Sequence, residues 1–95
     1  MKLITELLSL EFMTAFSKCG YDENLGQVGV SNRSDLCQFQ CNGALAGAKK
    51  YKKSPMIIAN EVIQKITDWD FIDKAEAILP GFINISVKDE FLISY

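Results

Sequence analysis

Residues 79–87 read Leu-Pro-Gly-Phe-Ile-Asn-Ile-Ser-Val, and this segment decides the fold. Pro80 and Gly81 supply the fixed φ and the positive φ that the two central positions of a type II turn require. Strict alternation follows the turn, which predicts a strand. Its two faces carry Ile83, Ile85 and Val87 on one side and Phe82, Asn84 and Ser86 on the other.

The second face sets an aromatic ring beside a carboxamide. Phe82 and Asn84 are two residues apart, so both point away from the isoleucines. A ring and an amide in this arrangement offer a nucleic-acid base a stacking plane and a hydrogen-bonding edge. The alternative interpretation is structural, with Phe82 packed under a neighbouring loop and Asn84 solvated. The alternation alone leaves both interpretations open.

The composition describes one small folded domain. The chain has 95 residues, of which 48% are hydrophobic and 23% are charged, as in ordinary globular proteins. No apolar run approaches the roughly twenty residues of a membrane span, and no cleavable signal pattern is present. These features predict a cytoplasmic protein without a membrane partner.

Cysteine and histidine content limits the chemistry. Three cysteines, an odd number, fit reduced thiols better than a disulfide framework. Cys37 and Cys41 are four apart and can meet on one helical face, but zinc needs further ligands, so no metal is expected. The chain has no histidine, the commonest general base, so a self-contained hydrolase is not expected either.

Hydrophobic periodicity divides the remaining chain into short elements. Gly20 is expected to cap the first helix, Asn42 to cap the second through its side chain, and Ser54-Pro55 to begin the third. The predicted elements are helices at 2–19, 41–51, 54–66 and 88–95, and strands at 27–30, 36–40, 71–79 and 82–87. Because the strands mostly follow one another directly, the sequence predicts an α+β fold. Helices would pack on one face of a small antiparallel sheet and leave the other face open.

The formal net charge is only −2, but the lysines are unevenly distributed. Four positive charges lie within five residues around Tyr51, in the lysine cluster formed by Lys49, Lys50, Lys52 and Lys53. Cations at a helix C-terminus interact favourably with the helix dipole, and this can explain the cluster. Contact with RNA phosphates explains it equally well. Tyr51 and Trp69 are expected to be core or loop anchors, not stacking planes.

Four motifs follow one another between residues 39 and 87. The run FQCNGALAGAKKYKKSP, Phe39 to Pro55, contains an aromatic-Gln-x-Asn-Gly start, an AKK run and a proline that begins a helix. The amphipathic segment Met56 to Ile66 and then LPGFINISV complete the set. In this order and at this spacing the motifs resemble the N-terminal additional domain of bacterial arginyl-tRNA synthetases. The resemblance covers most of Leu36 to Leu92.

The resemblance implies a domain, residues 1–95, that precedes the catalytic domain of a longer synthetase and contacts the D-loop in the elbow of tRNA(Arg). In that family an aromatic and an amide residue on the strand after the turn hold a D-loop base, and they correspond here to Phe82 and Asn84. Gln40 and the lysine cluster are further candidate tRNA-binding residues. DNA is not an expected partner. The alternative function is a structural or protein-interaction domain without direct RNA contact.

The resemblance also implies where catalysis lies. Class I synthetases activate the amino acid through HIGH and KMSK motifs, and neither occurs in this sequence. The 95 residues are therefore not expected to be an enzyme or to bind a cofactor, whereas the parent arginine-tRNA ligase would use ATP with magnesium. The sequence departs from the family pattern in two places. Leu36, Cys37 and Gln38 replace a frequent Phe-Gly-Asp, so contacts that depend on that glycine and acid do not carry over. Leu79 replaces a polar residue that reaches the D-loop in some relatives, so no hydrogen bond is expected from Leu79.

Overall fold

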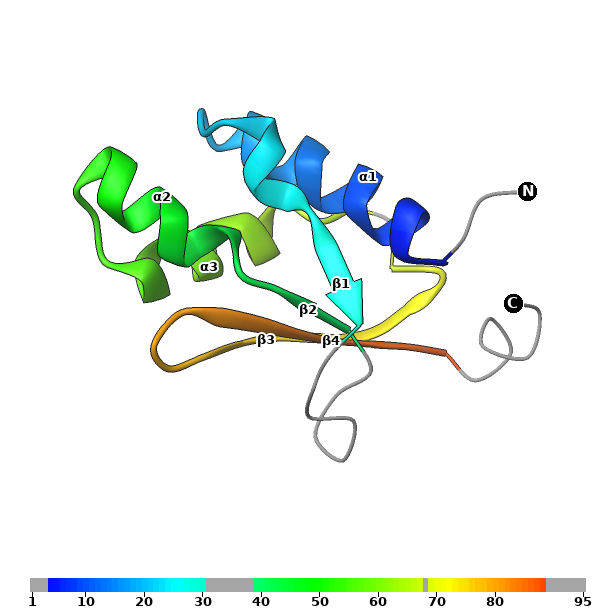
Figure 1. Cartoon of the computed structure of the whole chain (residues 1–95). Coiled ribbons are helices and arrows are strands. Elements are labelled where there is room, and N and C mark those ends of the chain that lie inside the picture. Colours follow the sequence, from blue (N-terminus) through cyan, green and yellow to red (C-terminus); the bar gives the residue numbers. More distant parts are fainter. Residues whose placement is uncertain (1–3, 31–38, 68, 89–95) are drawn as a thin grey trace.

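The computed structural model describes residues 4–30, 39–67 and 69–88 of the chain. Its elements follow one another in the predicted order (Figure 1). They are α1 (Ile4–Lys18), the 3₁₀ helix η1 (Glu23–Gly26), β1 (Val28–Val30), β2 (Phe39–Cys41), α2 (Gly43–Tyr51), α3 (Pro55–Gln64), β3 (Ile72–Ile78) and β4 (Phe82–Val87).

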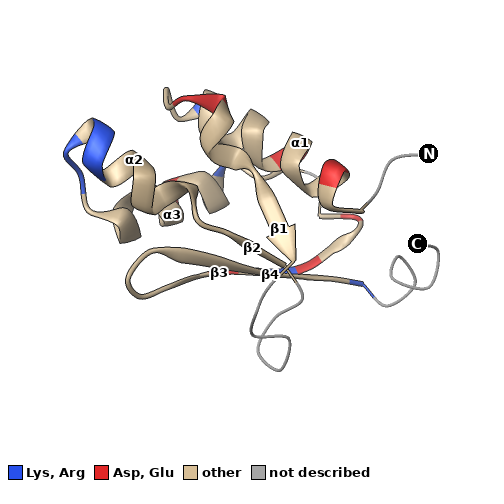
Figure 2. Cartoon of the chain, viewed as in Figure 1, with Lys and Arg blue, Asp and Glu red and all other residues tan. Residues whose placement is uncertain are grey.

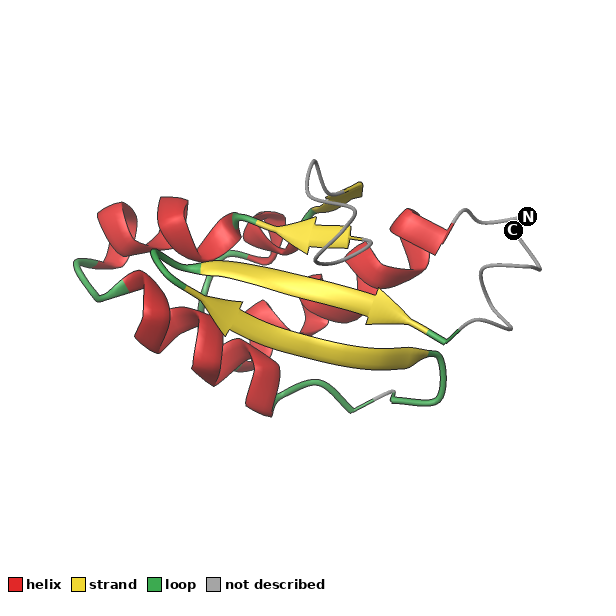
Figure 3. Cartoon of the chain, turned by 90° about the horizontal axis from the view of Figure 1, so that it is seen from below, coloured by secondary structure: helices red, strands yellow, loops and turns green. Residues whose placement is uncertain are grey.

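Within the described residues, four strands form one antiparallel sheet in the order β1-β2-β4-β3. The α-helices lie on one face of this sheet (Figure 1). Seen from below, from the side of the sheet that the helices do not cover, the long strands β3 and β4 lie in front of the helices (Figure 3). The predicted α+β architecture with one open sheet face is therefore confirmed.

The alternation of β4 separates the core from the open face as predicted. Ile83 and Ile85 are fully buried and Val87 is nearly so, whereas the residues between them are half-buried. The core side of β4 packs with the apolar sides of the helices. The largest buried side chains from those helices are Leu8, Phe12 and Phe16 of α1 and Ile58 and Val62 of α3.

The first helix ends as predicted, but two N-terminal caps do not form. Gly20 has a φ of +84°, and the amides of Gly20 and Tyr21 donate to carbonyls of the last turn, which is a Schellman arrangement. Asn42 and Ser54 occupy the N-cap positions of α2 and α3, but neither side chain makes a capping hydrogen bond. At α2 the backbone carbonyl of Asn42 accepts from the amide of Leu45 instead. The prediction of an Asn42 side-chain cap was wrong.

The hairpin between β3 and β4 is confirmed, but its turn is not of type II. The Leu79–Pro80 peptide bond is cis, and Gly81 has a φ of 159° instead of the roughly +80° of a type II turn. Gly81 is needed for space: a Cβ there would lie 2.4 Å from the Cβ of Pro55. The turn therefore rests directly on the first residue of α3.

Other boundaries differ from the prediction by a few residues. The predicted loop before β1 contains η1, and α3 ends at Gln64, two residues short of the buried Ile66. Cys41 ends a strand, so the helical pairing considered for Cys37 and Cys41 was wrong. Positions 36–38 of the predicted second strand, and all but Lys88 of the predicted last helix, lie outside the described residues. None of the described helices is long and apolar enough to cross a membrane.

Candidate nucleic-acid interface

The open sheet face carries a row of polar side chains across three strands. Asn84 of β4 lies opposite Gln40 of β2 on one side and Glu76 of β3 on the other. The Gln40 Nε2 group donates a hydrogen bond of 3.0 Å to Asn84 Oδ1. We call Gln40, Asn84 and Glu76 the polar row. The predicted candidates Gln40 and Asn84 therefore lie together on the open face.

The hydrogen bond from Gln40 determines what Asn84 can offer to a ligand. Its carbonyl oxygen accepts this bond, and its Nδ2 group donates to no other described residue. Asn84 therefore presents two N–H donors, which fit the acceptor atoms on the edge of a base. Glu76 forms an ion pair with Lys74 of the same strand, with 3.0 Å between Glu76 Oε1 and Lys74 Nζ.

The ring of Phe82 lies at the end of β4 nearest the turn, two residues from Asn84 and on the same face. It is half-buried, and Ile78 of β3 pairs with it in register. Leu79, the next residue along the turn, is 77% exposed and contributes apolar surface, as expected from its lack of polar atoms. Phe82 and Ile78 therefore form an apolar patch beside the amide donors of Asn84.

The lysine cluster lies at the C-terminal end of α2 and in the loop that follows (Figure 2). Lys49 and Lys50 belong to the last helical turn, and Lys52 is the C-cap with a φ of 55°. This end of α2 and the β3–β4 turn lie at the same end of the molecule (Figure 1). The helix-dipole contribution that the sequence predicts is thus available to these cations.

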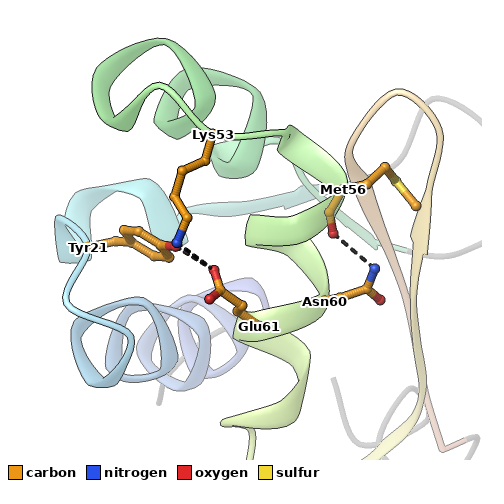
Figure 4. A network of polar contacts seen from close by, with 5 residues as sticks. All are labelled: Tyr21, Lys53, Met56, Asn60 and Glu61. Carbon is orange, nitrogen blue, oxygen red and sulfur yellow. Dashed lines mark hydrogen bonds and ion pairs between the residues drawn. The ribbon is translucent and has the colours of Figure 1, made fainter.

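Two of the four lysines have carboxylate partners. Lys50 Nζ lies 3.1 Å from Asp22 Oδ2, and Lys53 Nζ lies 3.3 Å from Glu61 Oε1. Lys53 also donates to the hydroxyl oxygen of Tyr21 at 2.5 Å, and this hydroxyl in turn donates to Glu61 (Figure 4). The ammonium group of Lys50 also lies over the ring of Tyr51, and that of Lys53 lies over the ring of Tyr21, each within about 6 Å of the ring centroid. These contacts hold α2 and the loop after it to the segment that follows α1 and to α3.

The same contacts shift the pKa values of the carboxylates. The hydrogen bond from the Asn24 amide, followed by that from Lys50, lowers the pKa of Asp22. The hydrogen bond from Tyr21, followed by that from Lys53, lowers the pKa of Glu61. Both carboxylates are ionised at neutral pH and neutralise the lysines beside them.

We expect Glu61→Gln to lower the thermal stability slightly at pH 7 and to have less effect at pH 3. Glutamine still accepts a hydrogen bond from Tyr21 but carries no charge for Lys53 to pair with. Because the pKa of Glu61 is lower in the folded chain than in the unfolded chain, its contribution is complete above about pH 5 and is lost as the pH falls through the folded value. Thermal unfolding of both proteins between pH 3 and 7 measures this. An equal Tm difference at both pH values would contradict it.

Tyr51 is an anchor, as predicted, whereas Trp69 is held at its indole nitrogen but keeps 40% of its surface exposed. The hydroxyl of Tyr51 accepts a hydrogen bond of 2.8 Å from the backbone amide of Asp22. The ring centroids of Tyr51 and Tyr21 are 4.9 Å apart. Trp69 Nε1 donates to the carbonyl of Ile66 at 3.1 Å. Burial raises the pKa of the Cys41 thiol to about 11, so this thiol is not a poised nucleophile.

Sequence reasoning did not identify the acidic and aromatic partners of the lysines. Asp22 is 28 residues from Lys50, and Tyr21 is 32 residues from Lys53. No local spacing pattern signals pairs at such separations. A hollow of about 330 Å³ beside the polar row was also missed, because it combines residues from η1, β1, β2, α2 and the connections between them, among them Gln27, Gln40 and Asn42.

Comparison with known proteins identifies the family to which these features correspond. A family model described as the arginyl tRNA synthetase N terminal domain matches residues 4–87. Arginine–tRNA ligase of Alkaliphilus oremlandii is 46% identical over 95 residues, and that of Agathobacter rectalis is 44% identical over the same length. The match covers the whole chain but only 16% of each relative.

Solved structures show the same fold. The arginyl-tRNA synthetase of Plasmodium falciparum matches 99% of the chain with a TM-score of 0.81 at 20% identity. That of Thermus thermophilus matches 97% with a TM-score of 0.81 at 19% identity. The matched parts are 18% and 15% of those chains.

Proposed function

Since this chain belongs to the arginyl-tRNA synthetase N-terminal domain family, we propose that it binds the D-loop in the elbow of tRNA(Arg). The proposal depends most on one observation: Phe82 and Asn84 share the open face of the sheet, while the isoleucines between and beyond them are buried. A base that leaves the stacked D-loop would lie on the ring of Phe82 and accept a hydrogen bond from Asn84 Nδ2. Gln40 would hold the Asn84 amide in the orientation that this contact needs.

We further propose that the domain acts as part of a longer arginine–tRNA ligase. The chain corresponds to about one sixth of the length of its relatives, and their names describe the ligation of arginine to tRNA. Residues 1–95 would form the N-terminal domain, with the catalytic domain of the same polypeptide as a partner. That domain would bind arginine and ATP with magnesium in the cytoplasm. Residues 1–95 would supply tRNA affinity.

The test compares Phe82→Ala with Ser86→Ala, a matched change on the same face of the same strand. Loss of base stacking, worth about 1 to 3 kcal/mol, is expected to weaken binding of a tRNA(Arg) transcript by about 5- to 150-fold in low-salt buffer. Ser86→Ala is expected to bind as the unchanged chain does. Fluorescence anisotropy with labelled tRNA gives the dissociation constants.

Two further measurements sharpen the test. Asn84→Asp replaces the N–H donors by acceptors and is expected to weaken tRNA binding as well. Circular dichroism should show that all variants are folded. Equal affinities for the unchanged chain and Phe82→Ala would overturn the proposal. Phe82 would then serve a protein contact, and protection of its face by the catalytic domain without tRNA would support that alternative function.

A further inference from the structure

The four lysines of the cluster divide into two pairs. Lys50 and Lys53 have carboxylate partners, at 3.1 and 3.3 Å. Lys49 and Lys52 are exposed, and their ammonium groups make no hydrogen bond or ion pair with any described residue. The sequence alone does not distinguish the four lysines. Among the described residues, Lys50 and Lys53 are each neutralised by a carboxylate, whereas Lys49 and Lys52 are not.

The two sides of α2 have different neighbours, and Lys49 and Lys50 lie on different sides of this helix. Gly47 faces Leu25 of η1, since a Cβ at this glycine would lie 3.2 Å from Leu25 Cδ1. Lys50 is three residues further and lies on the same side of the helix, where it reaches Asp22. This side of α2 is occupied by the protein itself.

The other side of α2 faces the β3–β4 turn. A Cβ at Gly81 would lie 3.3 Å from Leu45 Cδ2, so the Leu45 side of the helix approaches the residue that precedes Phe82. Lys49 is four residues after Leu45 and lies on that side. Lys52 follows in the loop that leads to Pro55, which the turn also contacts. Lys49 and Lys52 therefore lie on the helix side of the β3–β4 turn, and Phe82 follows the turn on the open face of the sheet.

We propose that Lys49 and Lys52 bind phosphates of the RNA strand whose base lies on Phe82, whereas Lys50 and Lys53 are positioning residues that hold α2 and the following loop in place. The proposal rests on the proposed function and assigns separate roles within its site. A phosphate that approached Lys50 or Lys53 would also meet the carboxylate of Asp22 or Glu61, so little net charge is available there. At Lys49 and Lys52 each phosphate contact would release a counterion.

The test measures the salt dependence of tRNA(Arg) binding for four variants of the full chain. Lys49→Gln and Lys52→Gln are each expected to reduce the slope of log affinity against log salt concentration by about 0.7 to 0.9 unit. The paired variants Asp22→Asn/Lys50→Gln and Lys53→Gln/Glu61→Gln remove each ion pair without changing the net charge. They are expected to leave the slope unchanged and to lower Tm.

Acetylation of lysines, followed by mass spectrometry, gives a second readout. Lys49 and Lys52 are expected to react rapidly in the free chain and to be protected by tRNA, whereas the reactivity of Lys50 and Lys53 should change little on binding. A slope reduced as much by the paired variants as by Lys52→Gln would overturn the assignment. So would unchanged slopes for Lys49→Gln and Lys52→Gln while Phe82→Ala still weakens binding. Absence of tRNA binding by the unchanged chain would instead refute the proposed function and this inference with it.

Discussion

Replacing Ile85 with alanine is expected to lower the free energy of unfolding by about 2 to 5 kcal/mol. Ile85 is fully buried in β4, between Phe39 of β2 and Ala75 of β3. The shorter side chain loses apolar contacts and leaves a cavity beneath the helices, which the strands on either side restrict from collapsing. Urea unfolding followed by circular dichroism measures the change.

The neighbouring change Ser86→Ala supplies the control, because Ser86 lies on the opposite face of the same strand. It is expected to change stability by no more than about 0.5 kcal/mol. A domain of this size is stable by roughly 5 to 14 kcal/mol, so a loss at Ile85 is readily resolved. Similar losses from the two variants would show that the faces of β4 are not assigned correctly, and Phe82 and Asn84 would then not lie on an open surface.

Replacing Gly43 with alanine is expected to cost about 3 kcal/mol or more. A Cβ at this position would lie 1.8 Å from the carbonyl oxygen of Leu25 and 2.6 Å from its carbonyl carbon. Both are backbone atoms, so the start of α2 and the end of η1 would have to separate. Thermal and urea unfolding measure the loss. The proposed tRNA contact should weaken as well, because α2 carries Lys49.

Gly29→Ala is the matched glycine control. A Cβ there meets no atom within 4 Å, and the residue lies in a strand, where alanine is favoured over glycine by about 0.5 to 1 kcal/mol. It is expected to leave stability unchanged or to raise it. If both variants behave alike, the close approach of α2 and η1 is not what requires Gly43.

The sequence predicted those parts of the fold that depend on local pattern. The alternation after Gly81 identified the buried and open faces of β4, and hydrophobic periodicity identified the first helix, which buries Phe12, Ala15 and Phe16. Gly20 marked the helix end because its left-handed φ is disfavoured for other residues. In each case the local residue pattern strongly favours one backbone conformation.

The sequence did not predict features that tertiary contacts decide. Asn42 can cap a helix, but it lies exposed at the start of α2 with a backbone conformation that leaves its side chain without a capping bond. At the turn, Pro80 is compatible with a trans or a cis bond, and the pattern does not distinguish them. These positions have more than one acceptable local conformation.

The candidate site shows the same division. Placement of Phe82 and Asn84 on one open face follows from the strand period, and the structure agrees with it. The bond between Gln40 and Asn84 joins residues 44 positions apart, so it depends on the pairing of β2 with β4. The division of the lysine cluster into two pairs depends on carboxylate partners from α3 and from the segment after α1. These partners are distant in sequence, so no local pattern identifies them.

The contact of Gly81 with Pro55 has a consequence for the entropy of binding. It joins the hairpin tip to the start of α3, two residues after Lys53, with no room for an intervening side chain. An RNA strand bound as proposed would therefore find the backbone that carries Phe82 and the backbone that carries the lysine cluster already fixed relative to each other. Less conformational freedom would be lost on association than if two independent loops had to be ordered.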